Sequence, residues 1–210
     1  MITVISPEKI QLPPGTLVRL LGSWQDYQLL SQLRGDGSTP RIKYRPGEII
    51  LMSPLPEHGR NANVIADVVK VLLDYLKQEY DAFTPMTMDL PEERGIEPDY
   101  CFYIDNWEAV SGKKRINWAI DPPPDLVIEI DVTSYTDVED YKPYRVPEIW
   151  LYKGNQFKIY SLEGDNYKIQ ANSRYFPNIN IVEVVQESLQ IASARNTSAA
   201  MRELRRKFNS

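Results

Sequence analysis

Acidic side chains recur on two segments that the sequence predicts to be β-strands, and their types suit a hard metal ion. Asp99 follows Pro98 at the start of one strand, while Glu129 and Asp131 alternate with apolar residues on another. Oxygen ligands suit Mg²⁺, and one or two carboxylates suffice because this ion retains several waters. If the strands are neighbours, Asp99 and Glu129 meet at a sheet edge, with the carbonyl of Ile130 as a third oxygen. The pattern predicts a Mg²⁺ or Mn²⁺ site suited to phosphodiester hydrolysis.

The same acidic residues also have a purely structural interpretation. Asp99 could end a turn, and Asp131 could cap a helix that follows the strand. Alternation places Asp125, Glu129 and Asp131 on one face of the strand 125–132, away from its apolar face. Clustered carboxylates repel one another, so a trio without a cation is costly. For Asp131 both interpretations stay open.

The elements predicted around these acids form an α/β or α+β arrangement, a mixed central sheet flanked by helices. Strand alternation and helical spacing of apolar residues define them, together with turn residues at their ends. The predicted helices are 24–34 after a capping box at Ser23, 59–78 and 195–208, with a short helix or turn at 137–144. The predicted strands are 41–44, 48–52, 83–88, 99–104 and 125–132, followed by an antiparallel meander of 148–153, 156–161 and 167–170.

Length and charge limit the architecture and the partners. The 210 residues suffice for one good core, so we expect a single domain over 1–210, with 1–22 as an N-terminal extension and 195–210 as a C-terminal helix. The net charge of −5 argues against tight phosphate-mediated binding of DNA, although it leaves a metal-dependent enzyme acting on DNA open. Basic residues gather near the C-terminus, where a solvated helix face is the simpler interpretation.

Cysteine content and hydropathy bear on the compartment. The single cysteine, Cys101, excludes an internal disulfide and a cysteine zinc cage. No apolar run approaches the roughly 20 residues that a membrane span needs, so no membrane partner is expected. The N-terminus does not have the pattern of a secretion signal. A cytoplasmic location is therefore the expectation.

Four segments together resemble a known family. GEIILMSPLPEHG (47–59), EPDYCFY (97–103), PPPDLVIEIDVTS (122–134) and VPEIWLYKGNQFKIY (146–160) are similar to the Uma family of bacterial proteins, classed with restriction endonucleases of the PD-(D/E)XK superfamily. The resemblance implies the restriction-endonuclease-like fold, with magnesium held by Asp99 and Glu129. It also implies that Glu48 and His58 lie near the pocket.

The sequence departs from the superfamily motif at one position. Asp131 stands two residues after Glu129, where the motif has a lysine that positions the attacking water and offsets phosphate charge. Asp137 occupies the place where many similar sequences carry a lysine on the next helix. Lys142 is then the nearest substitute and Lys153 a more distant one, while Asp131 could add a metal ligand.

Three functions follow from these observations. The leading hypothesis is a Mg²⁺-dependent endonuclease that hydrolyses phosphodiester bonds of DNA. The alternative is a catalytically silent nucleic-acid-binding or regulatory module that keeps the nuclease fold. One form of this alternative is a homodimer. A third hypothesis, a metal-dependent phosphoesterase for small nucleotides, would tolerate the negative net charge better.

Overall fold

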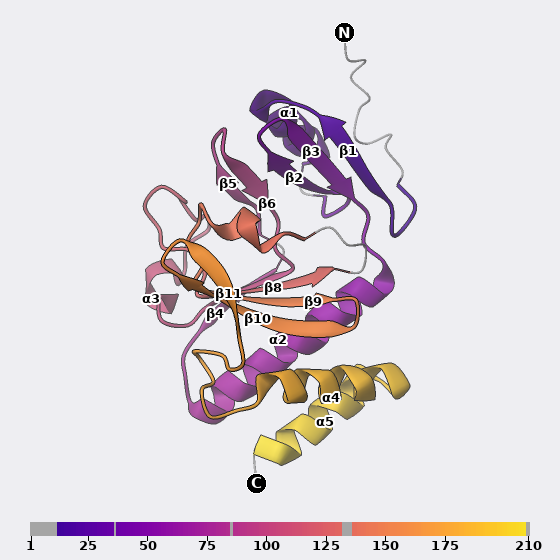
Figure 1. Cartoon of the computed structure of the whole chain (residues 1–210), viewed down its shortest axis with the longest axis vertical. Coiled ribbons are helices and arrows are strands. Elements are labelled where there is room, and N and C mark those ends of the chain that lie inside the picture. Colours follow the sequence, from indigo (N-terminus) through magenta and orange to yellow (C-terminus); the bar gives the residue numbers. More distant parts are fainter. Residues whose placement is uncertain (1–11, 36, 85, 132–135, 209–210) are drawn as a thin grey trace. The chain divides into compact units, whose positions relative to one another are not determined.

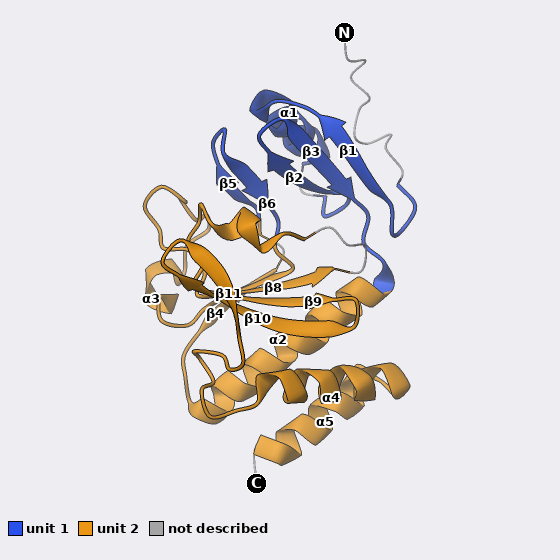
Figure 2. Cartoon of the chain, viewed as in Figure 1, with its two compact units in different colours: residues 1–56, 87–97 blue, residues 57–86, 98–210 orange. Residues whose placement is uncertain are grey.

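The computed structural model describes residues 12–35, 37–84, 86–131 and 136–208. The chain divides into two compact units (Figure 2). Unit 1 comprises residues 1–56 and 87–97, and unit 2 comprises residues 57–86 and 98–210. The expectation of a single domain stays a prediction.

Unit 1 is an antiparallel sheet with one helix. The sheet has the order β1-β3-β2-β6-β5, with β1 at Leu17–Leu21, β2 at Arg41–Arg45, β3 at Glu48–Met52, β5 at Met88–Leu90 and β6 at Arg94–Ile96. Helix α1 (Trp24–Arg34) begins with the predicted capping box, in which Ser23 and Asp26 satisfy each other's main-chain N–H. Aromatic and aliphatic side chains of α1, β2 and β3 form its core. Strand β1 lies within the segment expected to be an N-terminal extension.

Unit 2 contains the larger sheet, in the order β11-β10-β9-β8-β7-β4. Its strands are β4 (Asp81–Phe83), β7 (Tyr100–Tyr103), β8 (Leu126–Asp131), β9 (Glu148–Lys153), β10 (Gln156–Glu163) and β11 (Asn166–Gln170). β8 and β9 are parallel, and the other described pairs are antiparallel. A parallel pair needs a crossover, and the segment that joins β8 to β9 includes the 3₁₀ helix η2 (Val138–Tyr141).

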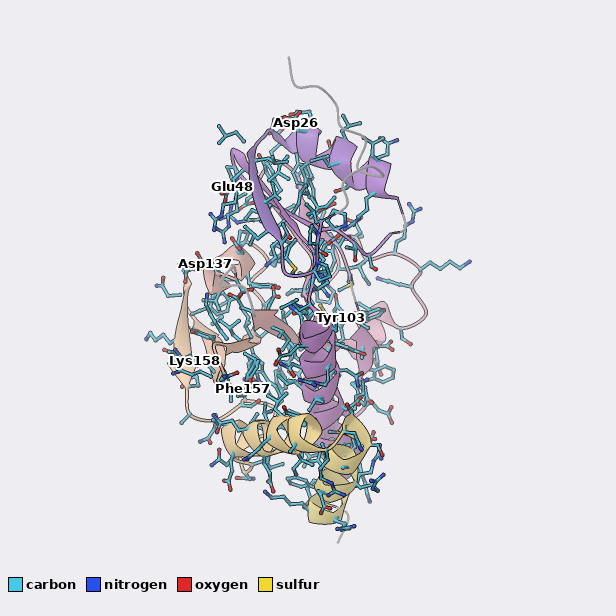
Figure 3. All side chains as sticks on the ribbon, turned by 90° about the vertical axis from the view of Figure 1, so that its right-hand side faces the viewer. Asp26, Glu48, Tyr103, Asp137, Phe157 and Lys158 are labelled. Carbon is cyan, nitrogen blue, oxygen red and sulfur yellow. The ribbon has the colours of Figure 1, made fainter. Side chains whose placement is uncertain are left out.

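Helices cover one face of this sheet (Figure 1). α2 (Pro56–Leu76), α4 (Ile181–Ala194) and α5 (Thr197–Phe208) contribute buried side chains to one core with the strands, whereas α3 (Trp107–Val110) is short. Phe157 of β10 belongs to this core, and its neighbour Lys158 is only half-buried, as alternation along a strand requires (Figure 3). None of the helices in the described part of the chain is long and apolar enough to cross a membrane.

The structure confirms the mixed α+β class, the flanking helices and the antiparallel meander β9–β11. The expected helix 59–78 is α2, which begins three residues earlier, at Pro56. The predicted strand 125–132 is β8, and Val132 lies outside the described residues.

One strand prediction was wrong, and several elements were not predicted. The expected strand 83–88 is split between β4, which pairs with β7 in unit 2, and β5, which pairs with β6 in unit 1. The apolar pattern spans both pieces because each one is partly buried in its own sheet. The unpredicted elements are β1, β6, α3 and α4.

Candidate metal site

Strands β7 and β8 bring the two predicted acids together. Their antiparallel register pairs Tyr100 with Ile128 and Cys101 with Val127. Continued by one residue, the same register sets Asp99 opposite Glu129, and Cβ atoms of opposite residues lie roughly 4.5–5.5 Å apart. The main-chain N–H of Ile130 donates to Oδ2 of Asp99 at 2.7 Å. The strands are therefore neighbours, as the metal interpretation requires.

Both acids lie on the sheet face that is turned away from the helical core. Tyr100 and Ile128 pack with the core residues, so Asp99, Cys101 and Glu129 project from the opposite face. Asp99 is 1% exposed and Glu129 is 3% exposed. Burial, followed by the charges of Glu129 and Asp99, raises the pKa of the Cys101 thiol well above its ordinary value. Two carboxylates thus share one enclosed region with this thiol.

His58 is the side-chain partner of Asp99. It lies in the first turn of α2, is 4% exposed, and its Nε2 is 2.6 Å from Oδ1 of Asp99. When Asp99 is ionised its carboxylate only accepts hydrogen bonds, so Nε2 of His58 is then the donor. Thr84 holds the main chain at the same residue, since its hydroxyl donates to the carbonyl oxygen of Asp99 at 2.7 Å. The only histidine in the sequence is therefore oriented toward the predicted site.

Glu129 has a partner that the sequence did not indicate. The hydroxyl of Tyr141, in η2, donates to Oε1 of Glu129 at 2.5 Å. Burial and the charge of Glu129 raise the pKa of Tyr141 well above 10, so the phenol keeps its proton and remains a donor. A tyrosine in a turn has no periodicity to mark it, and only its place near the end of the acidic strand could have suggested this contact.

Asp131 pairs with one of the two candidate lysines. In the parallel register of β8 and β9, Asp131 lies beside Lys153, whose Nζ is 2.9 Å from Oδ2 of Asp131. The same oxygen accepts the N–H of Thr136 at 2.8 Å, which ties Asp131 to the segment before η2. The expected helix cap at Asp131 is wrong, because the N-cap of η2 is Asp137, whose side chain accepts the N–H of Glu139. Lys142 instead contacts Glu139 and donates to Oδ1 of Asn166 at 3.0 Å.

Asp125, the third acid on this face of the strand, has a structural role. Oδ2 of Asp125 accepts the main-chain N–H groups of Ile104, Asp105 and Asn106 at 2.7, 2.9 and 3.0 Å. Oδ1 accepts the side-chain amide of Asn106 at 2.8 Å. Asp125 therefore fixes the loop after β7, and it differs in role from Glu129.

Glu48 lies in β3 of unit 1. Its carboxylate forms an ion pair with Arg19 at 3.1 Å, and its side chain is 27% exposed. The role near the pocket that the resemblance implies for Glu48 stays a prediction.

The donor set fits a hard cation that keeps part of its water shell. Both oxygens of Asp99 are engaged, by His58 and by the N–H of Ile130, but each carboxylate oxygen has a second lone pair. Within the described ranges, no group of three His, Cys, Asp or Glu side chains forms a metal cage. Asp99 and Glu129 would therefore hold the ion together with water, the arrangement usual for Mg²⁺. The carbonyl of Ile130 stays a predicted third ligand.

Comparisons with known proteins identify the family. No curated protein matches the chain. A crystal structure described as a "putative nuclease belonging to DUF820" from Anabaena variabilis ATCC 29413 is 15% identical, with a TM-score of 0.49, over 76% of this chain and 95% of that one. The model of the Uma2 family, described as "Putative restriction endonuclease", matches residues 24–194. Since that match covers most of the chain, the protein belongs to the Uma2 family of restriction-endonuclease-like proteins.

Proposed function

We propose that the protein is a Mg²⁺- or Mn²⁺-dependent endonuclease of the PD-(D/E)XK type that hydrolyses phosphodiester bonds of DNA. The observation that carries this proposal is the position of Asp99 opposite Glu129 on one enclosed sheet face, where Asp99 also accepts the N–H of Ile130, the residue after Glu129. Two buried carboxylates side by side repel each other, and a divalent cation between them removes that cost. Family membership supports a nuclease independently of this geometry.

The surrounding residues would orient these ligands. His58 fixes one oxygen of Asp99, and Tyr141 fixes one oxygen of Glu129, so neither carboxylate rotates freely. When bound, the cation would polarise the phosphate and lower the pKa of a coordinated water.

Lys153 is our candidate for the task of the motif lysine. It stands on the strand next to the acidic strand, and its amine reaches the carboxylate that occupies the motif position, Asp131. Its side chain is 40% exposed, so the amine is accessible to a substrate phosphate while it stays tethered. An ammonium group there can offset negative charge that develops on the phosphate. The contacts of Lys142 make it the weaker candidate.

Cleavage assays on plasmid and single-stranded DNA test the proposal. Wild type, Asp99→Asn and Glu129→Gln are compared with Mg²⁺ and with Mn²⁺, and the exposed acid variant Asp105→Asn is the matched control. Both site variants keep the side-chain shape, so we expect folded proteins with cleavage reduced about 10²-fold or more, and a control like wild type. Equal cleavage by all four proteins would refute the mechanism.

A second candidate function is a silent module that binds nucleic acid or a regulatory partner. The observation that favours it is that both oxygens of Asp99 already have a hydrogen-bonding partner within the protein, His58 for one and the N–H of Ile130 for the other. Calorimetric titration with Mn²⁺ and with an oligonucleotide separates the candidates. Metal binding without cleavage supports the silent module, and cleavage lost in both site variants supports the enzyme. A cytoplasmic location and a homodimer stay predictions.

A further inference from the structure

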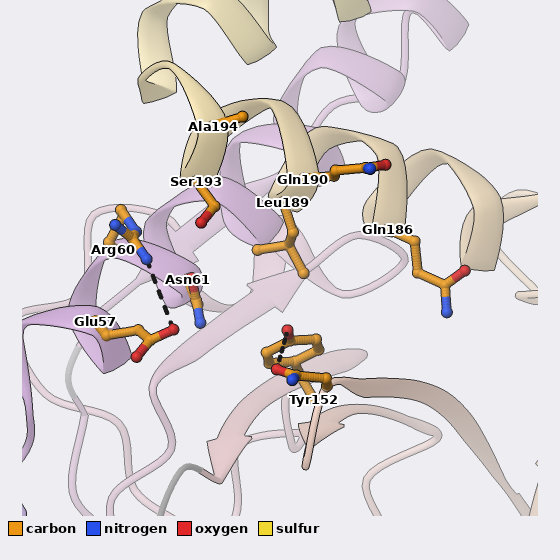
Figure 4. Close-up of a pocket in the computed structure, with 10 residues that line it drawn as sticks. Glu57, Arg60, Asn61, Tyr152, Gln186, Leu189, Gln190, Ser193 and Ala194 are labelled. Atoms are coloured by element: carbon orange, nitrogen blue, oxygen red, sulfur yellow. Dashed lines mark hydrogen bonds and ion pairs between the residues drawn. The ribbon is translucent and has the colours of Figure 1, made fainter.

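A polar pocket in unit 2 uses none of the residues assigned to the candidate metal site. It lies between the first turns of α2, the turn that joins β9 to β10, and α4 (Figure 4). Its volume is about 420 Å³, within the range of small-molecule sites. The lining residues that matter are Arg60, Asn61, Tyr152, Gln186, Leu189 and Gln190.

Asn61 is the residue that marks this pocket as a binding site. Its side chain is 7% exposed and points into the hollow (Figure 4). Across the described part of the chain, no hydrogen-bond partner holds its amide. The amide is accessible from the pocket, so a ligand that enters the pocket can pair with it. A ligand with an adjacent donor and acceptor would satisfy Asn61.

The pocket walls combine flat apolar surface with further amides. The half-buried ring of Tyr152 faces Leu189, which is 8% exposed. Gln186 and Gln190 are one turn apart on α4, so both present their amides on the same side. The hydroxyl of Tyr152 donates to Oδ1 of Asn155 at 3.1 Å, which holds the ring in place.

Charge at the pocket is balanced. Arg60 is 3.6 Å from Glu57, and both side chains are largely exposed at the rim. The other residues that line the pocket are uncharged. A neutral, planar ligand with hydrogen-bonding edges therefore fits better than a free phosphate or a carboxylate.

We propose that this pocket takes a single unstacked nucleobase of a bound nucleic-acid strand. Asparagine and glutamine amides match the paired donor and acceptor on a base edge, that of adenine best of all. Aromatic and apolar walls hold a base that has left its stack. The choice of a nucleic acid as the ligand rests on the proposed function. Binding of a base in this pocket, however, requires neither the metal ion nor cleavage of the strand.

Calorimetric titration of the full chain with 2′-deoxyadenosine, in the presence of a chelator, tests the proposal. We expect binding by wild type and about tenfold weaker binding by Asn61→Leu, which loses one hydrogen-bonding amide. The matched control is Asn63→Leu, an exposed position on the same helix, with wild-type affinity expected. The sugar phosphate 2-deoxyribose 5-phosphate, which lacks a base, should not bind.

Thermal melting distinguishes a ligand-binding asparagine from a structural one. If Asn61 stabilised the fold, its replacement would lower Tm. Because the amide of Asn61 makes no hydrogen bond with the described part of the chain, replacing it by leucine, which is of similar size, should leave Tm unchanged or raise it. A lower Tm for Asn61→Leu together with unchanged nucleoside affinity overturns the proposal. If Asn61→Leu does not fold, Gln190→Leu on the exposed face of α4 replaces it, and unchanged affinity in that variant is equally decisive.

The experiment separates this proposal from the nuclease proposal. Asp99→Asn should keep wild-type affinity for 2′-deoxyadenosine while it loses cleavage. Absence of nucleoside binding at millimolar concentration in a protein that cleaves DNA refutes the base pocket alone. Nucleoside binding in a protein without cleavage refutes the nuclease alone.

Discussion

Replacing Asp125 by alanine should destabilise unit 2 strongly, although Asp125 shares a strand face with the proposed metal ligand Glu129. Its carboxylate is 2% exposed and accepts four hydrogen bonds from the loop that follows β7. Alanine removes the acceptor and leaves the donors in place. The N–H of Ile104 is buried and cannot turn to water, whereas those of Asp105 and Asn106 lie nearer the surface.

These contacts set the magnitude of the expected loss. A buried hydrogen bond to a charged group contributes about 1.5–3 kcal/mol, and each of the other three contributes about 0.5–1 kcal/mol after water replaces the carboxylate. The sum is about 3–5 kcal/mol of unfolding free energy, allowing for incomplete additivity. For a chain of this size the corresponding fall in Tm is on the order of 10 °C.

Urea unfolding and thermal melting measure the change. Asp105→Ala is the matched control, because this neighbouring acid is exposed, and its loss should stay within about 0.5 kcal/mol. Below its lowered Tm, Asp125→Ala should still bind Mn²⁺ in a calorimetric titration. A loss of unfolding free energy below about 1 kcal/mol would contradict the structural role of Asp125. An abolished Mn²⁺ response in the folded variant would instead place Asp125 in the metal site.

Three further predictions address other contacts. Lys153→Met should lower kcat for DNA cleavage by about 10²-fold and leave Mn²⁺ binding intact; unchanged kcat would exclude this lysine. Gly95→Ala should cost about 1–3 kcal/mol in urea unfolding, because its Cβ would lie 2.4 Å from the Tyr27 ring, whereas Gly59→Ala meets open space and should not destabilise. Burial raises the pKa of Glu148 above 4.5. The stabilisation that Glu148 contributes is therefore present below its unfolded pKa and is lost as the pH rises through its folded pKa, so wild type should lose stability relative to Glu148→Gln as the pH is raised above 4.5; a gain would contradict this.

The sequence predicted the local elements of the candidate site well. Strand alternation assigned Glu129 to a face away from the core, and the Pro98–Asp99 step marked the entry to β7. Local spacing determines which face a side chain occupies. It does not determine which strands pair, so the approach of Asp99 to Glu129 stayed conditional until the register of β7 and β8 was known.

Other contacts depend on tertiary structure that no local pattern encodes. The pairing of Lys153 with Asp131 follows from the parallel register of β8 and β9, two strands separated by a crossover. The bond from Tyr141 to Glu129 depends on the path of that crossover. Helix α4 is a different case: its buried residues recur at helical spacing after the cap Asn180, so the sequence contained a pattern that predicts it.

The buried thiol of Cys101 can report on local opening of the structure around the candidate metal site. The thiol is fully buried beside Asp99 and Glu129, and it is the only cysteine in the sequence. An alkylating reagent can reach it only when the structure around this sheet face opens, so the rate of alkylation measures the free energy of that local opening. A cation bound by the two carboxylates would stabilise the closed form and slow the modification, which would reveal metal occupancy without any nucleic acid present.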